Sequence, residues 1–116
     1  MLQGAATIRR VSEAQASGFD VVCYRIVVRG RVQGVGFRWF VIRRAIELGV
    51  VGWVRNRPDR MSVEALAQGP VNTLNVFIEQ TMRVGPGGAF VSEMSVLDEV
   101  VDDEREMFWM EATGLE

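Results

Sequence analysis

The chain has 116 residues, a formal net charge of −2 and an apolar fraction of 48%, values that predict one folded domain rather than a disordered chain. Its thirteen basic residues are all arginine, and the absence of lysine and histidine excludes a lysine Schiff base and a histidine-activated nucleophile. One cysteine without histidine argues against a tetrahedral zinc site, and the small negative charge gives no electrostatic footprint for nucleic acid or an anionic membrane.

The first twenty residues, MLQGAATIRRVSEAQASGFD, show no apolar periodicity and are predicted to form a flexible N-terminal extension, followed by a domain over 21–116. They lack the apolar block of a secretory signal, and no apolar run approaches the ~20 residues of a membrane span. We therefore expect a cytoplasmic protein without a membrane partner. Cys23 has apolar neighbours and is expected to be a small buried strand residue.

A strand and then a helix are predicted after the extension. The stretch CYRIVVRG (23–30) alternates, with Tyr24, Ile26 and Val28 on one face, as in a half-buried strand. After a glycine-rich loop, apolar residues recur at helical spacing, at Phe37, Val41, Ala45 and Leu48. Gly49 is well placed to end this helix.

The rest of the chain predicts a hairpin, a second helix and two further strands. The stretches VVGWVRN (50–56) and MSVEALAQ (61–68) are predicted strands joined by the turn RPDR. The dipeptide Gly-Pro then opens a helix with an apolar stripe at Val71, Leu74, Ile78 and Met82. After the break RVGPGG, AFVSEMSVLDEV (89–100) alternates as a strand and MFWMEA (107–112) forms a short last strand.

This order predicts an α+β fold, a ferredoxin-like split βαβ sandwich with two helices on one face of an antiparallel or mixed sheet and a short additional C-terminal strand. The aromatic residues expected in the core or on the sheet are Trp39, Phe40, Trp53, Phe108 and Trp109. Acidic side chains at Glu64, Asp98, Glu99 and 102–106 are expected to be solvated. Since this fold serves many functions, the site has to carry the functional argument.

The stretch GRVQGVGFR (30–38) places three glycines and two arginines before the first helix. It fails as a dinucleotide fingerprint, which needs glycine where Trp39 stands, and as a nucleotide P-loop, which needs lysine. Gly34 and Gly36 permit backbone conformations in which successive N–H groups converge on an anion. Arg38 falls in the first helical turn, where a cation opposes the macrodipole but leans back toward the loop. This placement indicates an oxyanion site; the alternative is an ordinary turn beside a solvated arginine.

With GRVQGVGFR, GWVRN, QGP and VGPGGAFV, the chain resembles the acylphosphatase family from about Cys23 through the last strand. The resemblance implies hydrolysis of the carboxyl–phosphate bond of acyl phosphates to carboxylate and inorganic phosphate, without metal or cofactor. It places the family's phosphate-binding loop on Gln33, Gly34, Val35, Gly36, Phe37 and Arg38. It makes Arg38 the phosphate-binding arginine and Asn56 the residue that orients the attacking water.

The chemistry of these two side chains fits that role. An acyl phosphate already has a good leaving group, so positioning and charge stabilisation can suffice without a histidine base. Arg38 offers a planar fork that matches phosphate, and Asn56 can both accept from and donate to a water. A phosphate oxygen is the expected proton acceptor. The implied partners are a small acyl phosphate and water, and we expect a monomer that binds no nucleic acid.

Other interpretations remain open. On pattern alone, Asn56 before RPD is a turn former. A non-catalytic phosphate-binding or regulatory domain would keep the loop but would not need a water-orienting amide. An RNA-binding module of the same fold needs aromatic residues on the open face of the first and third strands, where the pattern predicts none. A related domain begins larger carbamoyl-phosphate-using maturation proteins; because this chain ends after one domain, we expect the free-standing enzyme.

The turn RPDR departs from the family pattern, because Arg60 stands where a glycine is common. We expect the backbone conformation of this turn to be less favourable with arginine than with glycine at position 60. Arg57 adds a positive charge beside Asn56, but strand alternation points it to the opposite face, so it is not assigned to the site.

Overall fold

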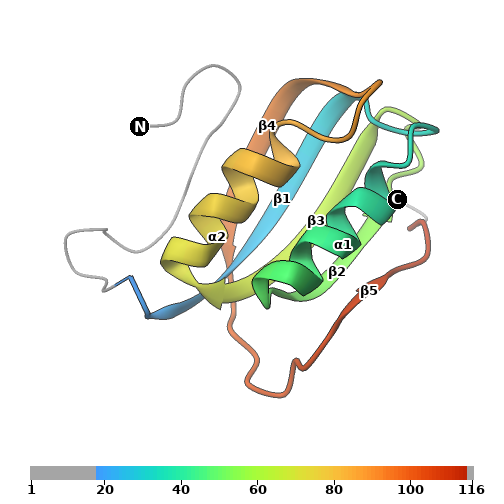
Figure 1. Cartoon of the computed structure of the whole chain (residues 1–116). Helices are drawn as coiled ribbons and strands as arrows, with labels where there is room; N and C mark the ends of the chain where they lie inside the picture. Colours follow the sequence, from blue (N-terminus) through green and yellow to red (C-terminus); the bar gives the residue numbers. More distant parts are fainter. Residues whose placement is uncertain (1–17, 115–116) are drawn as a thin grey trace.

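The computed structural model describes residues 18–114, so the predicted extension over 1–20 lies outside the described residues except for its last three (Figure 1). The described chain forms, in order, β1 (Val21–Arg31), α1 (Phe37–Leu48), β2 (Val51–Asn56), β3 (Ser62–Pro70), α2 (Val71–Phe77), the π-helical segment η1 (Ile78–Met82), β4 (Phe90–Glu99) and β5 (Phe108–Met110). Each predicted strand and helix is present.

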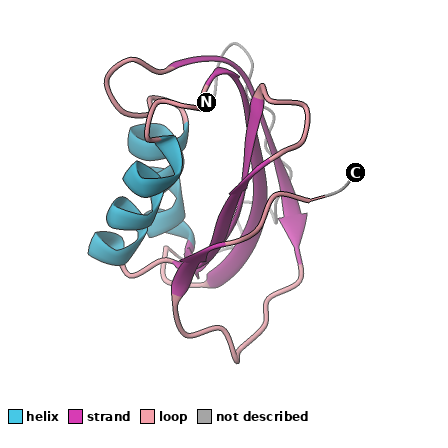
Figure 2. Ribbon diagram, turned by 90° about the vertical axis from the view of Figure 1, so that its right-hand side faces the viewer, coloured by secondary structure: helices cyan, strands magenta, loops and turns pink. Residues whose placement is uncertain are grey.

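The strands form one sheet in the order β4-β1-β3-β2-β5. Neighbouring strands are antiparallel, except that β5 runs parallel to β2. Both helices pack on one face of this sheet, and the described chain places no helix on the other face (Figure 2). The arrangement confirms the predicted ferredoxin-like sandwich.

The core lies between the sheet and the helices. Tyr24, Ile26 and Val28 of β1 are fully buried there, as their alternation predicts. The inner stripes of the helices pack against the same side of the sheet, with Phe37, Val41, Ala45, Val71, Leu74, Ile78 and Met82 all buried. Cys23 is also buried, as predicted, and burial raises the pKa of its thiol despite the opposing effect of nearby Arg105.

The segment before β1 holds the start of α2. The N–H of Val71 donates to the carbonyl of Asp20 at 2.9 Å, and the N–H of Asn72 donates to the carbonyl of Gly18 at 3.1 Å. These bonds satisfy two donors that the first turn of a helix cannot pair internally. The described residues just before β1 therefore contribute to the folded unit.

Trp39 is not in the core, and the prediction that placed it in the core or on the sheet is wrong. Its side chain is 67% exposed. The inner stripe of α1 begins at Phe37, and a residue two positions later is turned by roughly 200° around the helix axis. Trp39 therefore points to solvent, on the side of α1 that faces away from the sheet.

Glu64 is buried rather than solvated, which corrects a second prediction. The residue is 3% exposed, and its carboxylate accepts hydrogen bonds from Arg25 of β1 and from Nε of Arg55 of β2, the latter at 2.8 Å. Both guanidinium groups lie over the ring of Trp53, at 5.9 and 5.2 Å from its centroid. Glu64 lies on the face of the sheet opposite the helices, where the neighbouring strands enclose it with cations. Burial raises the pKa of Glu64, whereas the bonds from Arg55 and Arg25 lower it and prevail.

Candidate active site

The loop between β1 and α1 is built on two glycines in the left-handed region. Gly34 has φ 75° and Gly36 has φ 79°, and a Cβ added to either would meet no atom within 4 Å. Backbone conformation, rather than crowding, is therefore what favours glycine at both positions. Gly36 caps α1 without a side-chain hydrogen bond, and the first helical bond runs from the N–H of Phe40 to its carbonyl at 3.1 Å.

The N–H groups of this loop are left without acceptors inside the described chain. Those of Gly34, Val35 and Gly36 donate no hydrogen bond to any residue between 18 and 114. The N–H groups at the start of α1 have no internal acceptor by helix geometry. A row of donors at a helix N-terminus is the arrangement that binds an oxyanion.

Phe37 fixes the loop to the core. Its side chain is 2% exposed, so a phosphate could meet only its backbone N–H. The loop that leads into β4 packs against this ring: a Cβ on Gly85 would lie 2.5 Å from it, and Gly85 has φ 71°. Glycine at position 85 therefore allows the close approach that holds the start of α1 in place.

Arg38 is the second residue of α1 and is half-buried. Among the described residues, it forms no salt bridge or side-chain hydrogen bond. A cation in the first turn of a helix is unfavourable with respect to the macrodipole, and here no carboxylate of the described chain offsets it. The charge of Arg38 is thus not compensated within residues 18–114.

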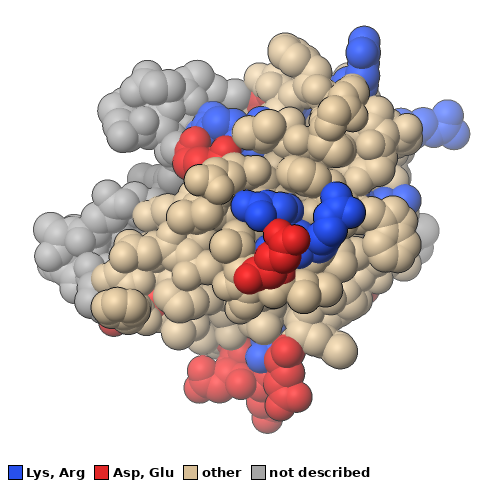
Figure 3. Space-filling model, viewed as in Figure 1, with Lys and Arg blue, Asp and Glu red and all other residues tan. Residues whose placement is uncertain are grey.

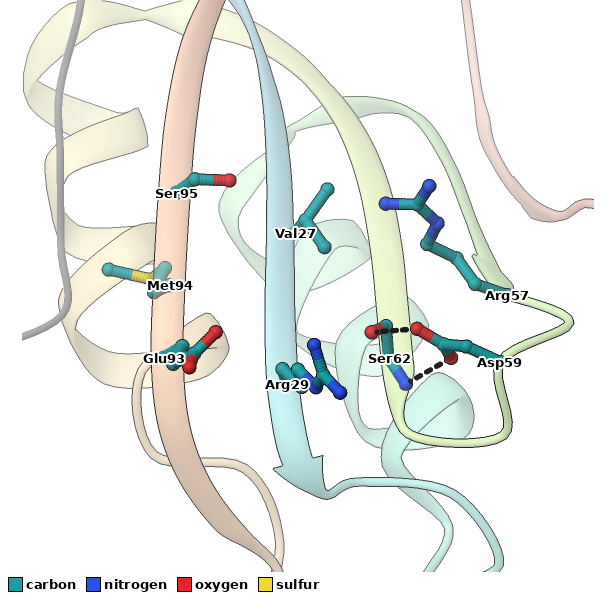
Figure 4. Close-up of a pocket in the computed structure, with 8 residues that line it drawn as sticks. All are labelled: Val27, Arg29, Arg57, Asp59, Ser62, Glu93, Met94 and Ser95. Carbon is teal, nitrogen blue, oxygen red and sulfur yellow. Dashed lines mark hydrogen bonds between the residues drawn. The ribbon is translucent and has the colours of Figure 1, made fainter. Parts of the chain in front are cut away.

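Asn56 is the last residue of β2 and pairs across the sheet with Val63. Since paired residues share a face and Val63 is in the core, Asn56 lies on the helix side of the sheet. The structure gives its side chain no hydrogen bond to a described residue. Arg57, by contrast, extends over the opposite face, as predicted (Figure 4).

Gln33 joins the loop to the turn that carries Asn56. Its Nε2 donates to the carbonyl of Arg57 and to the carbonyl of Ser62, both at 2.9 Å. Sequence reasoning predicted Gln33 only as part of the phosphate loop and missed this link. A polar side chain beside two loop glycines gave no signal that its partners would be carbonyls on another hairpin.

The turn itself is braced by Asp59. Its carboxylate accepts from the N–H groups of Met61 and Ser62 at 2.8 and 2.9 Å and from the Ser62 hydroxyl at 2.6 Å. The Ser62 hydroxyl is the main cause of a lowered pKa of Asp59. Arg60 has φ 64°, a left-handed conformation that is more favourable for glycine, in agreement with the expectation that arginine is less favourable at this position.

A separate hollow of about 460 Å³ lies on the open face of the sheet (Figure 4). It is lined by Val27, Arg29, Arg57, Asp59, Ser62, Glu93, Met94 and Ser95. None of the predicted site residues is among them. This hollow and the candidate site share the β2–β3 turn but face opposite sides of the sheet.

The surface over the helices carries charges of both signs (Figure 3). Arg44 pairs with Glu47, and Arg83 pairs with Glu79, each at 2.8 Å. No group of His, Cys, Asp or Glu in residues 18–114 could hold a metal ion, and no helix in that range is long and apolar enough to cross a membrane.

Comparison with known proteins decides the family. The acylphosphatase family model matches residues 24–110. The chain belongs to the acylphosphatase family. It is 56% identical to an acylphosphatase of Nitrobacter hamburgensis over 72 residues, which are 62% of this chain and 71% of that protein. This family membership confirms the resemblance stated from the motifs.

Solved acylphosphatases share the fold. The crystal structure of the acylphosphatase from Bacillus subtilis superimposes with a TM-score of 0.71 and 40% identity, covering 77% of this chain and 97% of that one. The acylphosphatase from Coxiella burnetii gives a TM-score of 0.72 at 34% identity, with coverage of 78% and 93%. The family domain thus accounts for most of the described chain.

Proposed function

We propose that this protein is an acylphosphatase that hydrolyses the carboxyl–phosphate bond of small acyl phosphates. The observation that carries the proposal is the loop over Gln33–Arg38: its free N–H groups and an uncompensated arginine stand beside the turn that follows Asn56. Family membership supports the reaction class. All of these groups belong to one chain, so we propose that a monomer suffices.

Phosphate binding is assigned to the loop and Arg38. The N–H groups of Gly34, Val35, Gly36, Phe37 and Arg38 would donate to the phosphoryl oxygens, with the Arg38 guanidinium as a bidentate donor. These donors would stabilise the charge that spreads over the equatorial oxygens during phosphoryl transfer. Because they are fixed before substrate arrives, little reorganisation would accompany the reaction.

Attack on phosphorus is assigned to a water held by Asn56. The side-chain amide can accept one hydrogen bond from the water and donate another, which orients an oxygen lone pair toward phosphorus. The new O–P bond forms as the P–O bond to the acyl group breaks, and the electron pair leaves with the carboxylate. The proton of the water passes to a phosphate oxygen, so the products are carboxylate and dihydrogen phosphate.

The test is steady-state hydrolysis of benzoyl phosphate in the presence of EDTA. Wild type, Arg38→Ala and Asn56→Ala would be compared, with Arg43→Ala as control, because Arg43 is an exposed arginine on the same helix. We expect turnover that survives EDTA, a raised KM together with a lowered kcat for Arg38→Ala, a lowered kcat with nearly unchanged KM for Asn56→Ala and no change for Arg43→Ala. Folded wild type without turnover would leave a phosphate-binding domain instead.

A further inference from the structure

We propose that Gln33 is a positioning residue: its side chain fixes the β2–β3 turn, and with it Asn56, relative to the phosphate loop. This inference rests on the proposed function. It gives the Gln33 side chain a role of its own, because the family resemblance placed Gln33 only in the phosphate-binding loop, whereas its side chain bonds to the β2–β3 turn. The backbone of Gln33 keeps its place in the loop.

Both amide hydrogens of Gln33 are engaged. Nε2 carries two hydrogens, and two carbonyl oxygens lie at 2.9 Å from it, those of Arg57 and Ser62. What remains on the side chain is Oε1, an acceptor, which would repel phosphate rather than bind it. Gln33 therefore acts on the reaction through the backbone that it holds.

The two carbonyls lie on either side of the turn. Arg57 directly follows Asn56, while Ser62 is the first residue of β3. The N–H of Arg57 also donates to the Ser62 carbonyl at 3.0 Å, so this oxygen accepts from both the turn and Gln33. Gln33 thus forms hydrogen bonds to both ends of the turn, at the position next to Asn56.

A second bond keeps β1 beside the same turn. The N–H of Gly30 donates to the carbonyl of Met61 at 3.0 Å. A Cβ at Gly30 would lie 2.2 Å from the carbonyl oxygen of Phe90, so a side chain there would displace the end of β1. The turn is therefore bonded to β1 through Gly30 and to the loop through Gln33, and the Gln33 bond to Arg57 is the one next to Asn56 in the sequence.

The consequence for catalysis is specific. Phosphate would be held by the loop, whose donors do not depend on the turn. The water would be held by Asn56, whose place depends on the turn. Loosening the link should therefore separate water from phosphorus and lower kcat, while KM and the inhibition constant of inorganic phosphate stay nearly constant.

The experiment compares Gln33→Glu and Gln33→Met with matched variants at Gln68. Gln68 also bonds to the backbone, but far from the loop: its Nε2 donates to the Asp102 carbonyl at 2.9 Å, and its Oε1 accepts from the Asp102 N–H at 3.0 Å and from Nη1 of Arg105 at 2.7 Å. For both Gln33 variants we expect kcat on benzoyl phosphate to fall about tenfold to hundredfold, with KM within about twofold. Gln68→Glu and Gln68→Met should leave kcat within about twofold.

A double-mutant cycle with Asn56→Ala separates positioning from direct contact. If Gln33 acts through Asn56, Gln33→Met in the Asn56→Ala background should lower kcat by less than about twofold further. Gln33→Glu supplies a second readout, because a protonated carboxyl can donate one hydrogen bond. Its kcat relative to wild type should rise as pH falls, and that of Gln33→Met should not.

Two results would overturn the inference. One is a full additional loss of kcat in the double variant, together with a raised phosphate inhibition constant, which would mean direct contact with phosphate. The other is unchanged kcat in both Gln33 variants while wild type is active. Failure of the proposed function looks different, because wild type itself would then show no turnover. Circular dichroism at the assay temperature establishes that each variant is folded.

Discussion

Two polar regions of the sheet contrast in how their charges are paired. On the open face, Glu64 is enclosed by Arg25 and Arg55, and Arg25 also pairs with Glu99 at 2.8 Å. At the end of the sheet near the β2–β3 turn, Arg38 and the loop N–H groups have no partner among the described residues. The paired charges link neighbouring strands on the open face, whereas the N–H groups of the loop and the Arg38 guanidinium can still bind a ligand. Substitutions in the two regions should therefore affect different properties.

The largest expected effect is on activity, at Arg38. Arg38→Ala should lower kcat/KM by about 10²- to 10³-fold, as loss of a preorganised donor to a developing oxyanion typically does. Arg38→Lys should recover only part of this, because an ammonium cannot make the bidentate contact. The free energy of unfolding, measured by urea titration, should barely change. A large loss of stability in Arg38→Ala would mean that Arg38 also stabilises the fold, contrary to the difference between the two regions.

The next effect is on stability, at Glu64. Glu64→Gln leaves two guanidinium groups without their carboxylate and should lower the free energy of unfolding by about 3 kcal/mol, the low end for a broken buried pair. We choose the low end because the side chains of Arg25 and Arg55 remain 33% and 20% exposed. Glu47→Gln, which breaks an exposed pair on α1, is the control and should cost below ~0.5 kcal/mol. Activity of the folded variant should match wild type.

Acid should lower the free energy of unfolding, because it protonates the Glu64 carboxylate. The folded-state pKa of Glu64 is lowered, so its ionised form stabilises the fold above the unfolded pKa of about 4.3. This contribution is lost as pH falls from that value through the folded-state pKa. Urea unfolding from pH 7 to pH 3 should show a decline at the acid end that is shallower in Glu64→Gln. Equal slopes in the two proteins would exclude Glu64 as a source of the decline.

The smallest expected effect is at Arg60. Arg60→Gly removes the cost of a left-handed non-glycine residue, roughly 1–2 kcal/mol, but adds freedom to the unfolded chain. The net gain in the free energy of unfolding should be about 0.5 kcal/mol, visible as a small rise in Tm. Arg43→Gly, in the middle of α1, should have the opposite sign. A loss of stability in Arg60→Gly would mean that the arginine side chain stabilises the turn.

Local patterns predicted the fold because each element carries its own periodicity. Alternation in β1 placed Tyr24, Ile26 and Val28 in the core, and the 4-4-3 spacing after Phe37 gave the inner face of α1. The exposure of Trp39 follows from that same stripe and could have been predicted from helix geometry. The prediction that arginine is less favourable than glycine at position 60 agrees with the positive φ of Arg60.

Contacts between distant strands could not be predicted in the same way. Glu64 meets Arg25 from 39 positions earlier, which depends on the register of β1 against β3. The Gln33 link likewise spans 24 and 29 positions to two carbonyls, and backbone acceptors leave no trace in side-chain identity. The assignments of phosphate binding to the loop and of water to Asn56 remain predictions. They rest on family membership and on donors without partners.

The burial of Cys23 gives the protein a built-in reporter of its own opening. The chain contains one thiol, which is 2% exposed and lies on β1, where the strand pairs with both β3 and β4. Its Sγ lies 3.9 Å from Nη1 of Arg105, in the segment between β4 and β5, so a thiol reagent can react there only when that segment moves away or the strands open locally. The rate of alkylation therefore measures how often the structure opens locally around the start of β1, without an engineered label and without denaturant.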